Sequence, residues 1–312
     1  MPQCPLCGAE YKLGDNVCIE CGKELPAPYE LWAQEQEDED EGPAPETAGR
    51  IIPSIGKPTD ISQLPPGSVT ILAGATLMLD EMVIDSGSVV IANGRIVDIV
   101  EGVLPDPGEG STYLDVTGAI VSAGFIEVHV HGMMGIDTNT ASPADFLRLS
   151  SEAAARGITA LVPTTLACPP QDLRRILTNL KEAREQEMPG AHLLGLHLES
   201  NFISQEFKGA QPPEFLVAPA DPGASVYLGI IDEFSDLIRI ITLAPELPGA
   251  VGLIPWLLER DITVSLGHSA ATYEEAVAGF DAGATHVTHL FNAMRPLHHR
   301  NPGLVGAALE RD

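Results

Sequence analysis

The chain has 312 residues, of which 44% are apolar, and 44 acidic residues outnumber 17 basic ones to give a formal net charge of -27. This length predicts one to three domains, and the apolar content is enough for a sizeable core. The acidic excess argues against nucleic acid and anionic membrane surfaces as partners. We find no apolar stretch typical of a transmembrane helix and no signal segment at the N-terminus. We therefore expect a cytoplasmic protein.

Two C-x-x-C-G segments contain four of the five cysteines: Cys4, Cys7, Cys18 and Cys21. Because cytosolic thiols are normally reduced, a metal site is favoured over disulfides. Four thiolates in paired knuckles are typical of a closed, tetrahedral, structural zinc site. We expect residues 1–25 to form a zinc ribbon whose folding depends on the metal and whose partner the sequence does not reveal. A redox C-x-x-C pair or a coincidental spacing are the alternatives.

Composition changes twice before the main body of the chain. Residues 26–68 contain an acidic run between 35 and 41 and several prolines, which predicts a disordered linker. From Val69, short β-rich runs are separated by turn residues, and Asn93-Gly94 indicates a hairpin. We predict a small antiparallel β unit over 69–118, as part of a β-sandwich.

Strand-like and helix-like segments alternate after residue 118. The strand-like runs cover 119–130, 158–165, 192–199, 237–243, 262–266 and 286–290, and helical stretches include 143–156, 170–187 and 273–282. Alternation with continuous apolar strands predicts a parallel sheet covered by helices. The expected fold class is therefore α/β, a TIM-like (β/α) barrel over 119–312 with about six of its eight strands present.

Polar clusters follow the expected strands where such a barrel builds its active site. The residues concerned are His129, His131, His197, Glu199, His268 and His289. Residues at i and i+2 of a strand share a face, so His129 can join His131, and His197 can join Glu199. Each cluster alone is more often incidental, or belongs to the core. Together, histidines and a carboxylate at successive strand ends indicate a catalytic metal with an open position.

Several segments, in this order, resemble the N-acetylglucosamine-6-phosphate deacetylase family of the amidohydrolase superfamily. They are Ala123-Gly-Phe-Ile-Glu-Val-His-Val-His-Gly, Gly195-Leu-His-Leu-Glu, Phe207-Lys-Gly-Ala, Thr242-Leu-Ala-Pro-Glu, Leu266-Gly-His-Ser-Ala and Thr288-His-Leu-Phe-Asn-Ala-Met. The resemblance runs from about Val69 to the C-terminus and excludes the cysteine segment and the linker. The last segment is highly specific, whereas the H-x-H segment is shared across the superfamily.

The resemblance implies roles for individual residues. Glu199, His268 and His289 match the family's main metal ligands, and His129 with His131 matches a pair that holds a second metal in some members. The metal would be zinc, with iron or another divalent ion as the alternative. Substrate contacts are implied at Asn292, Ala293, Arg300 and Gln211. A guanidinium such as that of Arg300 is also a strong bidentate partner for a phosphate. The family further implies a homodimer.

The sequence departs from the family at three places. Ser200-Asn201 replaces a Gly-Pro after the glutamate, and Gln211 replaces a histidine that contacts substrate. The family's catalytic aspartate belongs to a block at the end of strand 8, which the resemblance places beyond Asp312. No catalytic residue is therefore identified, since Asp137 and Asp281 do not fall at the matching place.

These observations predict a metal-dependent hydrolase that removes the acetyl group of N-acetylglucosamine 6-phosphate in amino-sugar catabolism, giving glucosamine 6-phosphate and acetate. In the family reaction the metal polarises the amide and activates water, and the aspartate transfers the proton. The activity of a chain ending at Asp312 is uncertain without that aspartate. One alternative is another amidohydrolase, such as a cyclic-amide hydrolase. The other is an inactive, truncated metal-binding or docking protein.

Overall fold

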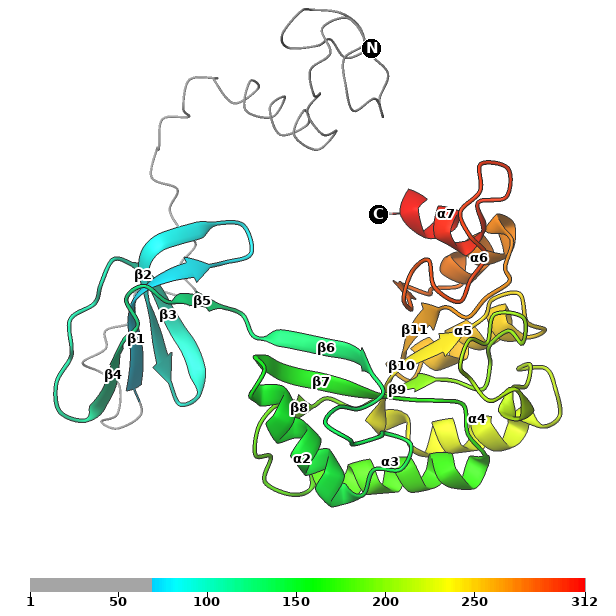
Figure 1. Ribbon diagram of the computed structural model, residues 1–312, viewed down its shortest axis with the longest axis horizontal. Helices are drawn as coiled ribbons and strands as arrows, with labels where there is room; N and C mark the ends of the chain where they lie inside the picture. Colours follow the sequence, from blue (N-terminus) through cyan, green and yellow to red (C-terminus); the bar gives the residue numbers. More distant parts are fainter. Residues whose placement is uncertain (1–68, 312) are drawn as a thin grey trace, which may run out of the picture. The chain divides into compact units, whose positions relative to one another are not determined.

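The computed structural model describes residues 69–311, and the chain divides into two compact units between Val121 and Ser122. The first unit contains five strands and the second contains the remaining strands and all the described helices (Figure 1). The predicted ribbon over 1–25, with Cys4, Cys7, Cys18 and Cys21, and the linker over 26–68 lie outside the described residues.

The first unit is one five-stranded sheet. Its strands are β1 (Val69–Met78), β2 (Val83–Ala92), β3 (Arg95–Glu101), β4 (Ser111–Asp115) and β5 (Ile120–Ser122), in the order β3-β2-β1-β4 with β5 also paired to β1. Asn93 and Gly94 both have positive φ, 51° and 72°, which confirms the hairpin between β2 and β3. The prediction of a purely antiparallel unit is wrong, because β1 and β4 pair in parallel.

A bulge at Gly74 determines which side chains of β1 are buried together. Ala73 packs in one apolar cluster and Ala75 in another, because the register shifts between them. A β-bulge bends a strand in this way and tolerates glycine at positive φ. Gly74 has φ of 83°, and a Cβ there would overlap the Thr117 side chain.

The second unit is a curled parallel sheet, which fits the predicted TIM-like (β/α) barrel class with part of its strands present. Its strands are β6 (Phe125–Val130), β7 (Ile158–Thr165), β8 (His192–Leu193), β9 (Leu196–Glu199), β10 (Ile238–Leu243), β11 (Thr263–Leu266) and β12 (His286–Val287). The order is β12-β11-β10-β9-β7-β6, with β8 beside β7, and the six strand pairings of this sheet are parallel.

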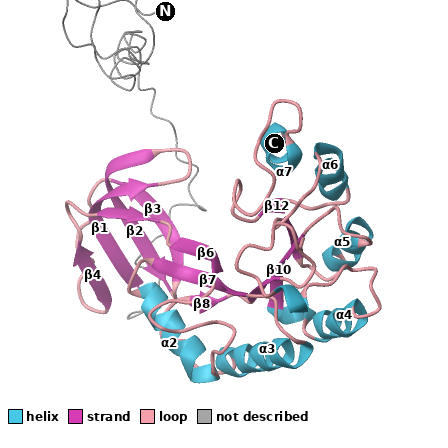
Figure 2. Ribbon diagram, turned by 45° about the vertical axis from the view of Figure 1, so that its right-hand side comes forward, coloured by secondary structure: helices cyan, strands magenta, loops and turns pink. Residues whose placement is uncertain are grey.

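Helices cover the outer face of this sheet and follow its strands in an arc (Figure 2). They are α2 (Pro143–Ala154), α3 (Pro170–Arg184), α4 (Ala224–Glu233), α5 (Ala250–Leu258), α6 (Tyr273–Asp281) and α7 (Gly303–Glu310), with short 3-10 turns η2 (Pro213–Phe215) and η3 (Ser235–Leu237). Ser142 and Thr272 begin α2 and α6 with capping boxes. The main core lies between these helices and the outward side chains of the strands.

The strands point the same way, so their carboxyl ends meet at one edge of the sheet, and the polar clusters follow those ends. Strand β12 is shorter than expected: it ends at Val287, because the chain leaves strand geometry at His289, where φ is 35°. Among residues 69–311, no helix has the length and apolarity needed to cross a membrane.

Candidate metal centre

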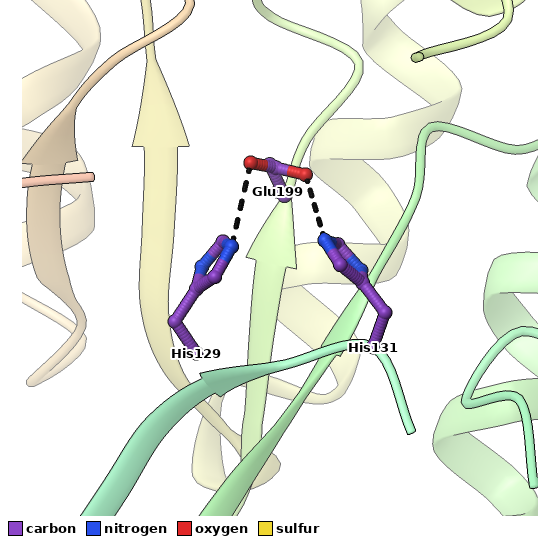
Figure 3. Close-up of side chains that lie close together, drawn as sticks. All are labelled: His129, His131 and Glu199. Atoms are coloured by element: carbon purple, nitrogen blue, oxygen red, sulfur yellow. Dashed lines mark ion pairs between the residues drawn. The ribbon is translucent and has the colours of Figure 1, made fainter. Parts of the chain in front are cut away.

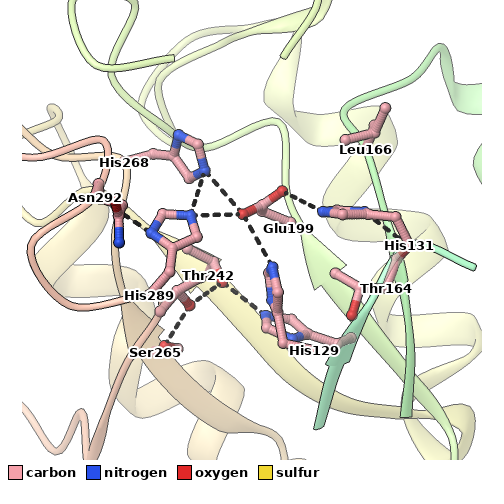
Figure 4. Close-up of polar contacts among 12 residues, drawn as sticks. His129, His131, Thr164, Leu166, Glu199, Thr242, Ser265, His268, His289 and Asn292 are labelled. Atoms are coloured by element: carbon pink, nitrogen blue, oxygen red, sulfur yellow. Dashed lines mark hydrogen bonds and ion pairs between the residues drawn. The ribbon is translucent and has the colours of Figure 1, made fainter. Parts of the chain in front are cut away.

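Glu199, the last residue of β9, is the centre of the site and only 2% exposed. Its Oε1 atom lies 2.8 Å from His268 Nε2, 3.1 Å from His289 Nε2 and 3.7 Å from His129 Nε2. Its Oε2 atom lies 3.3 Å from His131 Nε2. Imidazoles from three separate parts of the sheet therefore converge on one buried carboxylate (Figure 4).

Backbone carbonyls on the far side of three rings select the form that binds metal. His268 Nδ1 lies 2.8 Å from the Phe207 carbonyl oxygen, and His289 Nδ1 lies 3.0 Å from that of Asn292. His131 Nδ1 is 3.2 Å from a carbonyl oxygen as well. A carbonyl only accepts, so Nδ1 carries the proton and the neutral ring directs the Nε2 lone pair at Glu199.

This arrangement fits a cation between the rings. His268 Nε2 and His289 Nε2 lie 3.0 Å apart, and two neutral rings would set lone pair against lone pair at that distance. The buried Nδ1 atom of His129 has no hydrogen-bond partner among residues 69–311, so contacts with these residues do not fix its tautomer. Imidazole nitrogens with a carboxylate oxygen are the donor set of zinc and of ferrous iron.

Two groups of ligand atoms share the same carboxylate. Glu199 with His268 and His289 forms one group, and Glu199 with His129 and His131 forms the other; the atoms of each lie within 4.8 Å of one another. In the second group the two imidazoles face different oxygens of Glu199 (Figure 3). The geometry therefore offers positions for one or two ions.

Local electrostatics favour the ionised carboxylate. Burial acts to raise the pKa of Glu199, but without a metal ion the rings of His131, His268 and His289 can be protonated at Nε2, and their hydrogen bonds then outweigh burial and hold that pKa well below its usual range. The same bonds raise the pKa values of His131 and His289. Burial instead lowers the pKa of His129, which lies farther from the carboxylate. Protons and a metal ion therefore compete for the same ring nitrogens.

His197 shares the face of Glu199, as predicted, but serves a different purpose. Its ring joins the Val128 carbonyl oxygen, 2.9 Å from Nδ1, to Thr242 Oγ1, 2.7 Å from Nε2. Burial lowers its pKa to about 4, so the ring is neutral. The Thr242 hydroxyl is hydrogen-bonded to the Thr288 hydroxyl, with 2.7 Å between the oxygens. The Thr288 hydroxyl is in turn hydrogen-bonded to the Ser265 hydroxyl at 2.7 Å. This chain of hydroxyls, which no sequence motif indicates, ties β9, β10, β11 and the end of β12 together beneath the ligands.

Gln211 lies inside the site. Its side chain is 2% exposed, its Oε1 accepts a hydrogen bond from Ala167 N at 2.7 Å, and its Nε2 donates to Glu199 Oε2. The residue that departs from the family's histidine thus contacts the central ligand.

The loops that carry the last two histidines are joined to each other. His268 and His289 have positive φ of 47° and 35°. Residues other than glycine rarely adopt this backbone conformation, and those that do are often found at functional sites. Ser269 N donates to the Ala293 carbonyl oxygen at 3.1 Å, and Glu246 accepts from Ser269 Oγ at 2.7 Å. Burial raises the pKa of Glu246. Pro245-Glu246 belongs to the Thr242-Leu-Ala-Pro-Glu segment that resembles the family. The sequence does not predict that Glu246 binds the loop after His268.

The expected substrate residues lie on the chain just after this junction. Asn292 lies three residues after His289 in the ligand loop, and its carbonyl oxygen is the partner of the His289 ring. Ala293 has φ of 50° and links to Ser269. Arg300 is exposed and, with Arg295, lines a pocket at the start of α6 and α7. Neither arginine has an ion-pair partner among residues 69–311.

The two alternative carboxylates are engaged elsewhere. Asp137 is exposed and accepts a hydrogen bond from Asn139 N at 2.8 Å, in the turn after β6. Asp281 pairs with Arg311 at 2.5 Å on the surface.

A curled parallel sheet covered by helices, with histidines and a glutamate gathered at the carboxyl ends of its strands, is the arrangement typical of metal-dependent hydrolases of the (β/α)-barrel class. The Amidohydrolase family model matches residues 120–309. That is more than half of the chain, and the protein belongs to the amidohydrolase family.

Curated relatives share a narrower description. The chain is 35% identical over 219 residues to the N-acetylglucosamine-6-phosphate deacetylase of Danio rerio, covering 69% of this chain and 54% of that protein. The enzyme of that name from Bacillus subtilis is 35% identical over 239 residues, covering 76% and 59%. An N-acetylgalactosamine-6-phosphate deacetylase from Escherichia coli O157:H7 is 32% identical over 243 residues, covering 77% and 61%. The chain thus spans between half and two thirds of the length of these relatives.

Solved structures agree on the fold. The N-acetylglucosamine-6-phosphate deacetylase of Pasteurella multocida superposes with a TM-score of 0.70 at 30% identity, covering 78% of this chain and 62% of that one. A mutant of the Mycobacterium smegmatis enzyme, in complex with N-acetyl-D-glucosamine-6-phosphate, superposes with a TM-score of 0.69 at 32% identity, covering 78% and 61%.

Proposed function

We propose that this chain belongs to an enzyme that hydrolyses the acetamide of N-acetylglucosamine 6-phosphate at a divalent metal ion. The observation that carries the proposal is the convergence of four imidazoles on buried Glu199, with three of the rings fixed in the metal-binding tautomer. The relatives of that name and the sugar phosphate bound to the M. smegmatis enzyme support the choice of substrate.

Each residue has a proposed task. Glu199, His268 and His289 hold the ion, and His129 with His131 faces the other side of the carboxylate. Zinc is the ion that the donor set favours, with iron as the alternative. When bound, the ion polarises the amide carbonyl and lowers the pKa of a water molecule. We assign the family's proton-transferring aspartate to no residue between 69 and 311.

Recognition of the sugar phosphate falls to the loop after His289. We assign Asn292 and Ala293 to the sugar, since the bond between Ala293 and Ser269 fixes this loop beside the ligand His268. Arg300 is assigned to the phosphate, because a guanidinium binds phosphate oxygens in pairs and this one has no carboxylate partner among residues 69–311. Family resemblance further supports a homodimer, which sedimentation would test.

Acetate release from N-acetylglucosamine 6-phosphate tests the proposal directly. A metal-loaded protein that contains this chain together with the aspartate block implied by the family should release acetate, and the same protein treated with a chelator should not. Arg300→Ala should raise KM for the phosphorylated sugar by about 10- to 100-fold, because a charge-assisted pair is lost. Arg184→Ala, at the end of α3, is a matched control that should leave KM unchanged. Loaded protein that releases no acetate from the sugar phosphate would contradict the proposal.

A second substrate is favoured by one comparison. The E. coli relative named for N-acetylgalactosamine 6-phosphate matches nearly as well as the others. Measuring kcat/KM for both sugar phosphates, with a cyclic amide as a third substrate, separates these functions. We expect N-acetylglucosamine 6-phosphate to give the highest value; preference for the cyclic amide would indicate a different amidohydrolase.

A further inference from the structure

The two oxygens of Glu199 have unequal surroundings. Oε1 faces the imidazoles of His268, His289 and His129 and, within residues 69–311, accepts no hydrogen bond from an amide. Oε2 faces only one imidazole, that of His131, and also accepts a hydrogen bond from the Gln211 side chain. Gln211, which stands where the family has a histidine, therefore contacts only the Oε2 atom of the carboxylate.

The orientation of the Gln211 amide is determined by its other neighbour. Ala167 N is a main-chain donor, and it lies 2.7 Å from the Gln211 oxygen. The NH2 group must then face Glu199 Oε2, since the reverse orientation would oppose two N–H groups at Ala167. Gln211 N also donates to the Lys208 carbonyl oxygen at 3.0 Å, and the side chain is 2% exposed, so the contact is built into a closed loop.

An amide nitrogen in this position cannot be a metal ligand, because its lone pair is delocalised and its hydrogens point at the acceptor. It occupies one lone pair of Oε2, and it directs the positive end of its dipole at the place where an ion bound by His131 and Oε2 would sit. Histidine at the same position can offer a lone pair instead. Among residues 69–311, no amide donates a hydrogen bond to Oε1.

We propose that Gln211 makes the centre selective for one ion, bound at Oε1 by Glu199, His268 and His289, and weakens a second ion at His129 and His131. This inference rests on the proposed metal centre but not on the proposed substrate. Hydrogen bonds to charged groups correspond to about 10- to 100-fold in an equilibrium constant, so we expect a second-ion Kd that much weaker than without the amide.

Counting zinc ions per full-length chain tests the proposal. Protein equilibrated at a fixed micromolar concentration of free zinc and desalted is analysed by mass spectrometry of the metal. With Gln211 retained, His131→Ala should leave the number of zinc ions per chain unchanged, whereas His268→Ala should lower it. Gln211→Glu keeps the acceptor for Ala167 N and replaces the NH2 by a ligand oxygen, so it should gain one ion. The double variant Gln211→Glu/His131→Ala should lose that ion again.

All variants carry the same cysteine segment, so any ion that it binds cancels in the differences. Loss of one ion in His131→Ala alone would overturn the proposal, as would a soluble, folded Gln211→Glu that gains none. If Gln211→Glu does not fold by circular dichroism, the His131→Ala comparison still decides. An unchanged count in His268→Ala would instead show that the metal centre itself is wrongly assigned.

Discussion

Glu246 offers a prediction about how the ligand loops are held in place. Its carboxylate accepts hydrogen bonds from Ser269 Oγ and Ala270 N, the two residues that follow the ligand His268. Glu246→Leu leaves both donors without a partner, and Ser269 is fully buried. An unpaired buried donor costs about 1–3 kcal/mol. Burial raises the pKa of Glu246, which shows that the folded protein bears a cost for desolvating this carboxylate. Removing the carboxylate removes that cost and offsets part of the loss. We expect a net loss of about 1–3 kcal/mol in the free energy of unfolding.

The same substitution should weaken metal binding, because Ser269 and Ala270 follow His268 directly. Substitutions just outside the ligands typically weaken metal affinity by about 10- to 100-fold, and we expect Glu246→Leu at the lower end of that range. Glu246→Gln is the matched control: its amide oxygen still accepts from Ala270 N, and the Ser269 hydroxyl can accept from the amide nitrogen. It should stay within about 1 kcal/mol of the unsubstituted protein.

Urea unfolding of metal-free protein and competition for zinc with a chelating dye measure the two effects separately. The reasoning is refuted if Glu246→Leu changes neither quantity. It is also refuted if Glu246→Gln is as damaging as Glu246→Leu, because the hydrogen bonds would then not be the cause.

Three further predictions concern other parts of the second unit. Burial raises the pKa of Cys168 to about 12. Iodoacetamide at pH 8 should therefore modify this thiol far more slowly in the native protein than in urea, as measured by mass spectrometry. Rapid labelling of Cys168 in the native protein would contradict this prediction. The pKa values of His131 and His289 are raised above the ordinary 6.5, so zinc affinity should fall as the pH decreases from above 6.5 towards 5; an affinity independent of pH in titrations would oppose the assignment. Gly132→Ala should lower the thermal midpoint, because φ is 136° and a Cβ would overlap the Ile136 carbonyl oxygen, whereas Gly135→Ala, at φ of 78° in open space, should lower it less; equal effects would refute the steric argument.

The parallel strands and their polar ends were predictable because both signals are local. Continuous apolar runs such as 158–165 indicate buried parallel strands, and parallel strands bring their carboxyl ends to one edge. His129, His131, Glu199, His268 and His289 could therefore be grouped before their contacts were known. Their arrangement around one carboxylate depends on distances in the folded chain, which the spacing of residues along the sequence does not give.

Helices α4, α5 and α7 were not predicted, and α5 and α7 lack the usual amphipathic pattern. Helix α5 reads Ala-Val-Gly-Leu-Ile-Pro-Trp-Leu-Leu, which is apolar throughout and includes Pro255, so it shows no amphipathic period. Helix α7 contains two glycines within eight residues. Packing against the sheet overrides these weak local preferences. The parallel pairing of β1 with β4 was missed for a related reason, since hairpin signals report only neighbouring strands.

The contact between Gln211 and Glu199 shows the limit most clearly. Comparison with the family's pattern identified position 211 as a departure, but an amide can accept or donate at either end. Only the position of Ala167 N, 44 residues earlier in the chain, determines that the NH2 group faces the carboxylate.

The central claim is that Glu199, His268 and His289 hold one catalytic ion. Anomalous diffraction at the zinc absorption edge, from crystals grown with zinc, tests it most directly. We predict a strong peak within bonding distance, about 2.0–2.2 Å, of Glu199 Oε1, His268 Nε2 and His289 Nε2. Zinc peaks elsewhere in the chain with none beside Glu199 would contradict the account.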